Sequence, residues 1–473
     1  MLNALFQHSA TASYLVGLAF SVYLIVVIAP YLSQRRGEKG DPDGCRWHFF
    51  VPCDRDAARV RGTITALRWN FPEAHIWVPD DAGLTPTATI VGQLALQDAA
   101  IHLVKQVPPP VGVGGGHEPF NALYRALDGW LAPCADRSDV IVAVIHPGSR
   151  LRQDSLATVV GPRYFGDPQV TVVQVAERLV NRVDLDPLAG HRPRTGRLRK
   201  AWARLLVRLQ DVQSQGPMMA ARLALRRGGA IGFSGNGQFV RLSGLDALGG
   251  VEKRPWRSPS HEYDLAVHLL IRGHRTVYAH ETWTERAGPP MLGQLMIRQI
   301  KHSRRNLRRA RYLPSLWRNP ALSAWDTVLT ALILTRTWLG AIAGLVYGTP
   351  VLALLVATAL YPSDAIGAVP LVMWLSWAAI VILGVLQFAV WGPLYALKIE
   401  PRSHPFQAAG WGLAYVGYVL LSCVATWLAI AWVGVRGPRG HGRHRGYVPH
   451  PQPIGSRGVE QGSASVTVEK VRQ

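Results

Sequence analysis

Residues 231–241 of this chain read Ile-Gly-Phe-Ser-Gly-Asn-Gly-Gln-Phe-Val-Arg, so glycines surround one asparagine in an otherwise apolar run. Glycine lets the backbone take up positive φ angles and approach other groups closely, which indicates a tight turn at a binding site. A plain turn that joins a helix to a strand is the alternative. The polar positions that we single out are Gly235, Asn236, Gly237 and Gln238.

Short β-rich runs alternate with helix-like stretches on both sides of this turn. The clearest runs are residues 48–51, 74–78, 140–145 and 170–175. Alternation of strands and helices predicts an α/β domain with a mostly parallel sheet. Such sheets bind ligands at the carboxyl ends of their strands, so the residues that directly follow each run are the first candidates for chemistry.

Carboxylates stand at two such positions. Asp80 and Asp81 end the second run, and Glu262 lies in Ser260-His261-Glu262, directly before an apolar helical pattern. Acidic residues at strand ends can bind a ribose or a base, although paired aspartates also serve as turn or capping residues. A carboxylate at a helix start can likewise cap the helix or act as a general base.

Apolar blocks flank this domain at both ends of the chain. Residues 14–32 form an uncharged run that is long enough to cross the ~30 Å hydrocarbon core of a bilayer. Three further blocks cover residues 325–361, 365–397 and 408–435. We therefore predict an anchor at 1–33, a cytoplasmic domain at 34–297, a basic interfacial helix at 298–324, a transmembrane cluster at 325–436 and a disordered tail at 437–473.

The number of C-terminal spans stays open because Arg336 falls near the middle of its apolar block. A charge at the bilayer centre costs several kcal/mol, so we favour an interfacial helix followed by one span over about 337–361. The alternative is a hairpin broken at Gly348-Thr349-Pro350. Three spans place the tail outside the cell, and four return it to the cytoplasm, which the basic residues after 435 favour.

The formal net charge of +21 alone suggests nucleic acid or anionic lipid as a partner. Much of the charge lies beside the apolar blocks, where basic residues mark the cytoplasmic side of a membrane protein, so we expect membrane lipids and no nucleic acid. The four cysteines have neither metal-site nor disulfide-framework spacing.

Several motifs in one order make residues 47–313 resemble the family-2 inverting glycosyltransferases, the class that includes cellulose, chitin and hyaluronan synthases. The motifs are Val51-Pro52, Asp80-Asp81, Phe120-Asn121-Ala122, Gln174 with Arg178 and Asn181, Gly235-Asn236-Gly237-Gln238-Phe239, and Glu262-Tyr263-Asp264-Leu265 with Arg272-Gly273. The resemblance implies a GT-A-like fold, a nucleotide-sugar donor and a divalent metal, Mg²⁺ or Mn²⁺.

The resemblance also implies roles for single residues. The nucleotide-sugar side receives Asp80, Asp81, Asn121 and His146, the acceptor side receives Gly235, Asn236, Gly237, Gln238 and Gln299, and Glu262 takes the place of the general base. The family's Asp-x-Asp metal motif falls on His146-Pro147-Gly148, which has lost both carboxylates. The Gln-x-x-Arg-Trp motif keeps Gln299 but loses its Arg and Trp. The sequence therefore assigns no metal ligand.

The expected function is that of a multi-pass plasma-membrane hexosyltransferase of polysaccharide or cell-envelope biosynthesis. It would transfer a sugar, with inversion, from a nucleotide sugar to a glycan or lipid acceptor. The lost motifs favour a second interpretation, a catalytically inactive pseudo-glycosyltransferase that acts as membrane-protein partner or scaffold of an active synthase.

Overall fold

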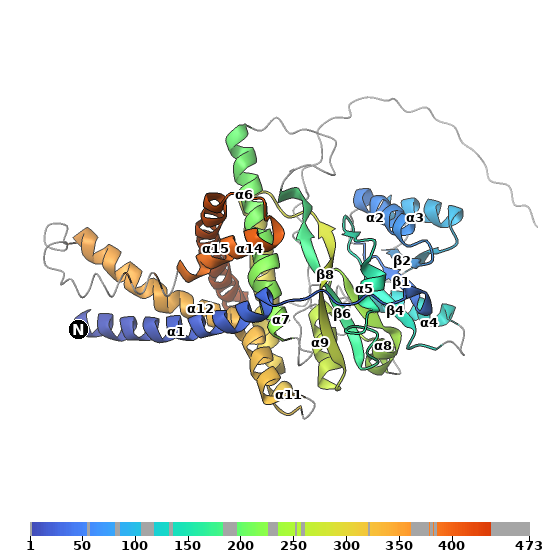
Figure 1. Ribbon diagram of the computed structural model, residues 1–473, viewed down its shortest axis with the longest axis horizontal. Coiled ribbons are helices and arrows are strands. Elements are labelled where there is room, and N and C mark those ends of the chain that lie inside the picture. Colours follow the sequence, from blue (N-terminus) through green and yellow to red (C-terminus); the bar gives the residue numbers. More distant parts are fainter. Residues whose placement is uncertain are drawn as a thin grey trace, which may run out of the picture.

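The computed structural model describes residues 2–53, 57–80, 86–105, 118–131, 136–182, 196–225, 235–250, 253–256, 261–319, 322–360, 378, 382 and 386–436. Within these ranges, the side chains of residues 2–10, 57–58, 261–264, 348–360 and 433–436 are not described. A domain built on one sheet occupies one side of the molecule, and long helices extend from its other side (Figure 1).

The sheet has eight strands in the order β3-β2-β1-β4-β7-β6-β8-β5. Their bounds are β1 Arg46–Phe50, β2 His75–Asp80, β3 Ile101–Lys105, β4 Val140–Val144, β5 Arg150–Leu151, β6 Val170–Leu179, β7 Gln238–Arg241 and β8 Arg275–Arg286. The pairings β1–β2, β2–β3, β1–β4 and β6–β8 are parallel, whereas β7 runs antiparallel between β4 and β6, and β5 runs antiparallel to β8. The predicted mostly parallel α/β sheet is confirmed.

The helices around the sheet are α2 Ala57–Asn70, α3 Pro86–Gln97, α4 Glu118–Trp130, α5 Ser155–Val159, α6 Arg197–Gln213, α7 Met219–Ala224, α8 Leu242–Gly249 and α9 His261–Ile271. Short helical turns are η1 Pro42–Gly44, η2 Val180–Arg182, η3 Ser214–Met218, η4 Arg308–Tyr312 and η5 Leu386–Val390. The remaining helices are α1 Leu2–Leu32, α10 Leu292–Leu307, α11 Leu313–Trp317, α12 Ala324–Leu360, α14 Trp391–Ile399 and α15 Pro405–Arg436.

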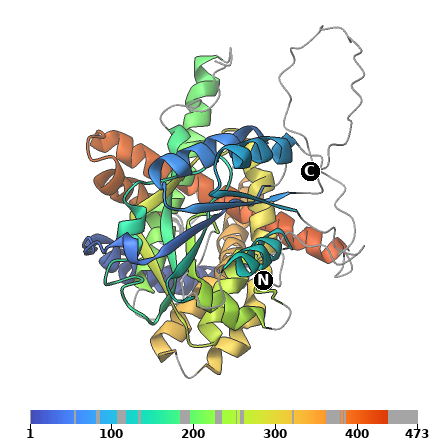
Figure 2. The ribbon, with the colours of Figure 1, turned by 90° about the vertical axis from the view of Figure 1, so that its right-hand side faces the viewer.

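The central strands are apolar because helices cover both of their faces. Every residue of β4, which reads Val-Ile-Val-Ala-Val, is buried. In Figure 2, α2 and α3 lie over one face of the first half of the sheet and α4 lies over the other. A continuous apolar strand is the pattern expected for a parallel sheet between two helical layers.

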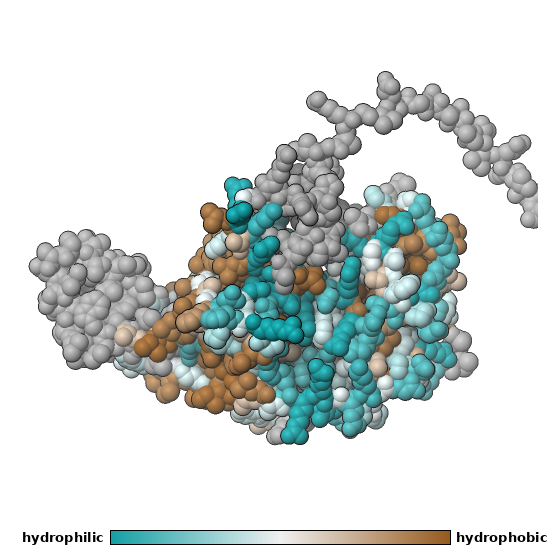
Figure 3. Space-filling model, turned by 45° about the horizontal axis from the view of Figure 1, so that its top comes forward, coloured by the Kyte–Doolittle hydropathy of each residue, from teal (hydrophilic) through white to brown (hydrophobic). Residues whose placement is uncertain are grey.

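Within the part of the chain that the structure describes, three helices are long and apolar enough to cross a membrane, over Thr11–Leu32, Ala324–Tyr347 and Pro405–Trp432. Apolar residues gather over this part of the molecule, whereas polar residues prevail over the sheet domain (Figure 3). Helices α1 and α12 pack together, since the Tyr347 hydroxyl donates to the carbonyl of Ser13 (3.0 Å). Helix α12 continues unbroken through Gly348-Thr349-Pro350, so the alternative of a hairpin turn at these residues is wrong.

The short helix α14 lies against the sheet domain. Its Trp391 is 1% exposed, and a Cβ added at Gly216 of η3 would lie 3.0 Å from the Trp391 ring. The ring also meets Tyr31 of α1 edge to face, with centroids 5.8 Å apart. Through Trp391, helix α14 packs against both the first apolar helix and the domain that carries the candidate site.

Candidate functional site

Residues 235–237 of the glycine-rich stretch form a turn between two central strands. Gly235 and Gly237 have φ angles of 80° and 72°, which other residues rarely adopt. The Gly237 amide donates to the carbonyl of Val144 (2.8 Å), and the Gly237 carbonyl accepts from the amide of Val175 (3.0 Å). A Cβ at Gly237 would lie only 2.5 Å from the Val175 side chain, so only glycine fits between β4 and β6.

The side chain of Asn236 ties three segments together. It is 3% exposed, and its Oδ1 accepts from the backbone amide of His146 (3.0 Å). Its Nδ2 donates to the hydroxyls of Ser149 (3.1 Å) and Thr284 (3.2 Å). The structure thus brings His146 and Asn236 together and fixes the residues that follow β4 against β8.

Gln174 of β6 hydrogen-bonds to the backbone of the turn. Its Nε2 donates to the carbonyls of Asn236 (2.8 Å) and Gly237 (3.2 Å). Gln238, the first residue of β7, is fully buried in the sheet. The turn is therefore a rigid part of the sheet, and an acceptor role for its residues stays a prediction.

The donor side of the predicted site falls at the ends of β1, β2 and β4. Asp80 ends β2 and is 4% exposed, while Asp81 lies outside the described residues. Asn121 is fully buried in α4, where its amide donates to the carbonyl of Trp256 (2.9 Å) and accepts from the Trp256 amide (3.1 Å). Asn121 thus holds the segment 253–256, and its predicted contact with a nucleotide sugar stays untested.

The last two predicted residues lie on different helices. Glu262 is the second residue of α9, and its side chain lies outside what the structure describes. Gln299 lies on α10, and its amide donates to the hydroxyl of Tyr418 on α15 (2.6 Å). Gln299 therefore belongs to the packing of α10 on an apolar helix, and a contact with an acceptor stays a prediction.

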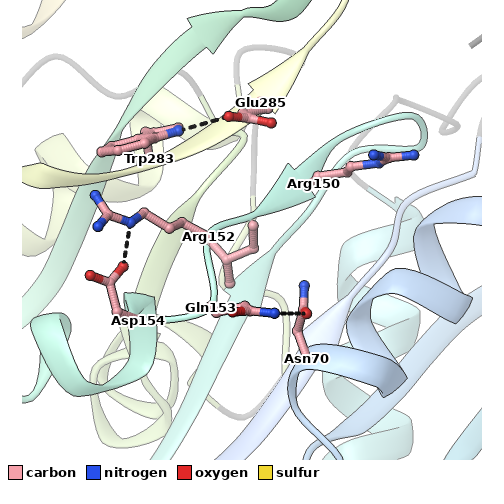
Figure 4. Close-up of a pocket in the computed structure, with 8 residues that line it drawn as sticks. Asn70, Arg150, Arg152, Gln153, Asp154, Trp283 and Glu285 are labelled. Atoms are coloured by element: carbon pink, nitrogen blue, oxygen red, sulfur yellow. Dashed lines mark hydrogen bonds and ion pairs between the residues drawn. The ribbon is translucent and has the colours of Figure 1, made fainter. Parts of the chain in front are cut away.

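A polar hollow of about 430 Å³ lies at the β5–β8 edge (Figure 4). It is lined by Asn70, Arg150, Leu151, Arg152, Gln153, Asp154, Trp283 and Glu285. The guanidinium groups of Arg178 and Arg152 lie 3.3 and 4.2 Å from the centroid of the Trp283 ring, and the Trp283 indole donates to Glu285 (3.1 Å).

Sequence reasoning missed this hollow. Alternation along β8 is the signal that could have found it, because successive side chains of a strand point to opposite faces. Thr284 bonds to Asn236, and its neighbours Trp283 and Glu285 line the hollow.

Two carboxylates with little exposure mark the second half of the sheet, the fully buried Asp211 and Glu177, whose side chain is 12% exposed. Burial opposes ionisation of Glu177 on β6, but its ion pair with Arg286 on β8 holds the Glu177 pKa below its usual range. Burial raises the pKa of Asp211 on α6, against the opposing effect of Arg182 (3.5 Å). The Tyr395 hydroxyl on α14 donates to Asp211 (2.7 Å).

The residues that the structure describes do not form a divalent-metal centre of the kind the resemblance implies. Among the described residues, no group of three or more His, Cys, Asp or Glu side chains is placed to hold a metal ion. Mg²⁺ and Mn²⁺ prefer oxygen ligands, and His146-Pro147-Gly148 has no carboxylate at the family's metal position.

The sequence matches no protein-family model, and no curated protein matches it. Among solved structures, it is similar to the mannosyltransferase PcManGT from Pyrobaculum calidifontis, solved in complex with GDP-mannose and Mn²⁺, with 15% identity and a TM-score of 0.54. That similarity covers 90% of this chain and 99% of PcManGT.

This chain has a GT-A-like fold. A second match is glucosyl-3-phosphoglycerate synthase from Mycobacterium tuberculosis, with 16% identity over 53% of this chain and 75% of that protein. Its TM-score of 0.29 is too low to carry an argument. The fold assignment therefore depends on PcManGT, whose likeness extends over the sheet domain and the helices that follow it.

Proposed function

We propose that this protein is a membrane-bound glycosyltransferase that transfers a sugar from a nucleotide sugar to a glycan or lipid acceptor with inversion. The observation that carries the proposal is the GT-A-like sheet in which Asn236 fixes the His146 turn at the carboxyl end of β4. Ligands of such sheets bind at this edge. PcManGT, solved with GDP-mannose, has the same general fold.

Glu262 is the proposed general base. It is the second residue of α9, and a carboxylate at the start of a helix can take the proton from an acceptor hydroxyl. In an inverting transfer the acceptor hydroxyl oxygen bonds to the anomeric carbon, the bond to the nucleoside diphosphate breaks, and the hydroxyl proton passes to Glu262. Arginine and lysine side chains can neutralise the diphosphate in place of a cation.

The second candidate function is a pseudo-glycosyltransferase that partners an active synthase. It is favoured by one observation, the replacement of the family's metal motif by His146-Pro147-Gly148. An active but metal-independent enzyme and an inactive partner differ in turnover. Both functions allow the protein to bind a nucleotide sugar.

Titration of the purified chain with a panel of nucleotide sugars, with and without Mg²⁺ or Mn²⁺, tests donor binding. We expect at least one donor to bind with an affinity that a chelator leaves nearly unchanged. A loss of about tenfold or more in chelator would show carboxylate ligands outside the described residues. Failure of every donor to bind would exclude the transfer reaction and leave the partner function standing.

Turnover of Glu262→Gln tests catalysis. The substitution keeps size and removes basicity, so we expect a loss of about 10²–10⁴-fold in turnover with donor binding retained. Asp264→Asn, two residues along the same helix, is the matched control and should act mainly through stability. If Glu262→Gln keeps more than about a tenth of the activity, the base assignment is wrong.

Orientation is part of the proposal. Basic residues follow the first apolar helix and precede α12, so the sheet domain should face the cytoplasm of a plasma-membrane protein. Labelling of Cys134 in intact cells with an impermeant thiol reagent measures this. Reaction from outside the cell would overturn the orientation.

A further inference from the structure

One side of helix α10 and the η4 turn is lined with basic residues. Arg298, His302, Arg305 and Arg309 follow one another at steps of four, three and four residues, which places them on one side of a helix. We call these four residues the cationic stripe. The side chains of Arg298, His302 and Arg305 are exposed, so a ligand can reach them.

An adjacent side of α10 packs on the apolar helices. The Ser303 and Thr426 hydroxyls are 3.1 Å apart, which joins α10 to α15. The Trp338 indole of α12 donates to the carbonyl of Leu307 (3.1 Å) at the end of α10. The cationic stripe is therefore held beside two helices that are long and apolar enough to cross a membrane.

Arg336 of α12 adds a fourth arginine to those of the stripe. The surrounding protein and the charges of Arg309, Arg336, Arg298 and Arg305 lower the pKa of His302 well below its usual value, so the ring is neutral at pH 7 although it can be reached from solvent. Burial and Arg286 together lower the pKa of Arg298 to about 10. Arg336 lies within the candidate span Ala324–Tyr347, and its charge acts on His302 of α10, so arginines of both helices face the same region.

Apolar surface lies beside this charge. Leu332 and Leu339 stand four residues before and three residues after Arg336, hence on the same side of α12. Their exposed fractions are 37% and 45%. A cation within an apolar span costs several kcal/mol unless an anion or water stabilises it, and polybasic segments at membranes attract anionic lipid headgroups.

We propose that the cationic stripe and Arg336 bind the phosphate headgroup of a membrane lipid, whose hydrocarbon chain lies along Leu332 and Leu339. Arginine side chains suit this partner because the guanidinium fork matches phosphate oxygens. The inference concerns lipid binding and uses no nucleotide sugar. It therefore stands or falls separately from the proposed transfer reaction.

The test is a titration of the full chain in phosphatidylcholine nanodiscs with phosphatidic acid, followed by native mass spectrometry of bound lipid. Arg336→Gln and Arg298→Gln should each weaken binding about tenfold, as expected for loss of a charge-assisted hydrogen bond. Arg336→Lys keeps the charge and should keep most of the affinity. Lys301→Gln is the matched control, because it removes an exposed charge of α10 from outside the stripe.

An equal loss in Lys301→Gln would overturn the proposal in favour of diffuse attraction by a basic helix. Binding that does not depend on phosphatidic acid would exclude a phosphate site. In a parallel arm, inorganic phosphate should compete poorly with the lipid. Competition at equal concentration would assign the site to a soluble phosphate instead. Circular dichroism of each variant separates loss of binding from loss of folding.

Discussion

The two halves of the sheet accommodate buried polar groups in opposite ways. Around β1, β2 and β3, the rings of His48, His75 and His102 stack on one another and against aromatic side chains, with ring centroids 5.4 and 5.3 Å apart along the histidines. Around β6 and β8, buried carboxylates face arginines, as in the ion pair of Glu177 and Arg286.

The difference concerns charge. Burial and the neighbouring histidines lower the pKa of His48 to about 3, so the first half is stable only with neutral imidazoles. Arg286 keeps Glu177 ionised in spite of its burial, so the second half depends on a charge pair. The first arrangement should be sensitive to acid, and the second should be sensitive to removal of a single partner.

The largest expected effect on stability is that of Glu177→Gln. The change leaves Arg286 with an unbalanced charge near Arg298, and breaking a buried pair typically costs about 3–5 kcal/mol. Thermal unfolding of the purified chain in detergent measures the loss. The double variant Glu177→Gln/Arg286→Leu should recover much of it, and a single variant as stable as wild type would contradict the comparison.

Asn236→Ala tests the junction between the halves. It removes the acceptor of the His146 amide and the donor to Ser149 and Thr284. Buried groups left without partners should cost about 2–3 kcal/mol in the free energy of unfolding. Thr284→Val removes only one partner of the amide and should cost about 1 kcal/mol in the same measurement. Equal losses of stability in the two variants would show that the hydrogen bonds of Asn236 form and break together.

Acid should destabilise the first half. A histidine with a lowered folded-state pKa takes up its proton mainly after unfolding, so stability is full above the unfolded pKa of 6.5 and falls as the pH drops towards 3. At pH 5 the expected loss from His48 alone is about 2 kcal/mol. Chemical unfolding between pH 7.5 and pH 5 measures it.

His48→Asn is the control, because its amide oxygen can accept the bond that the Trp77 indole now donates to the imidazole (3.1 Å). The variant should lose stability at neutral pH through its smaller volume and yet show a weaker dependence on pH. An unchanged slope would assign the acid sensitivity to other groups.

The sequence predicted the first half of the sheet better than the second. The runs at 48–51, 74–78 and 140–145 correspond to β1, β2 and β4, because parallel strands are continuous apolar segments. Strand β7 was not among the predicted runs. It is short, it follows the glycine-rich turn directly, and its place in the sheet depends on antiparallel pairing with β4 and β6, which are far away in the sequence. No local pattern reports such an insertion.

In the candidate site, too, the sequence predicted local backbone features but not contacts between distant segments. The glycines of 235–237 indicated a tight turn, and their positive φ angles confirm it. The partners of Asn236 come from positions 146, 149 and 284, which are far apart in the chain. The stack of Arg152, Trp283 and Arg178 likewise depends on the pairing of β5 with β8, which follows from tertiary structure alone.

The smallest effect should come from Asp211→Asn, which distinguishes the two buried carboxylates of the second half. Burial raises the pKa of Asp211, so the neutral acid is favoured by folding, whereas Glu177 is held ionised. A raised folded-state pKa means that this carboxyl contributes most at pH values below its unfolded pKa and loses that contribution as the pH rises. An asparagine is permanently neutral. Its amide oxygen can still accept from the Leu179 amide, which now donates to Oδ1 (2.9 Å), and its NH2 group, in place of Oδ2, can donate to the Tyr395 hydroxyl. We therefore expect a change below about 1 kcal/mol at neutral pH, within the range of an ordinary hydrogen bond. Thermal unfolding of Asp211→Asn and Glu177→Gln under the same conditions compares the two carboxylates directly. An equal loss of stability in both variants would show that the ion pair of Asp211 with Arg182 outweighs the effect of burial on the acid.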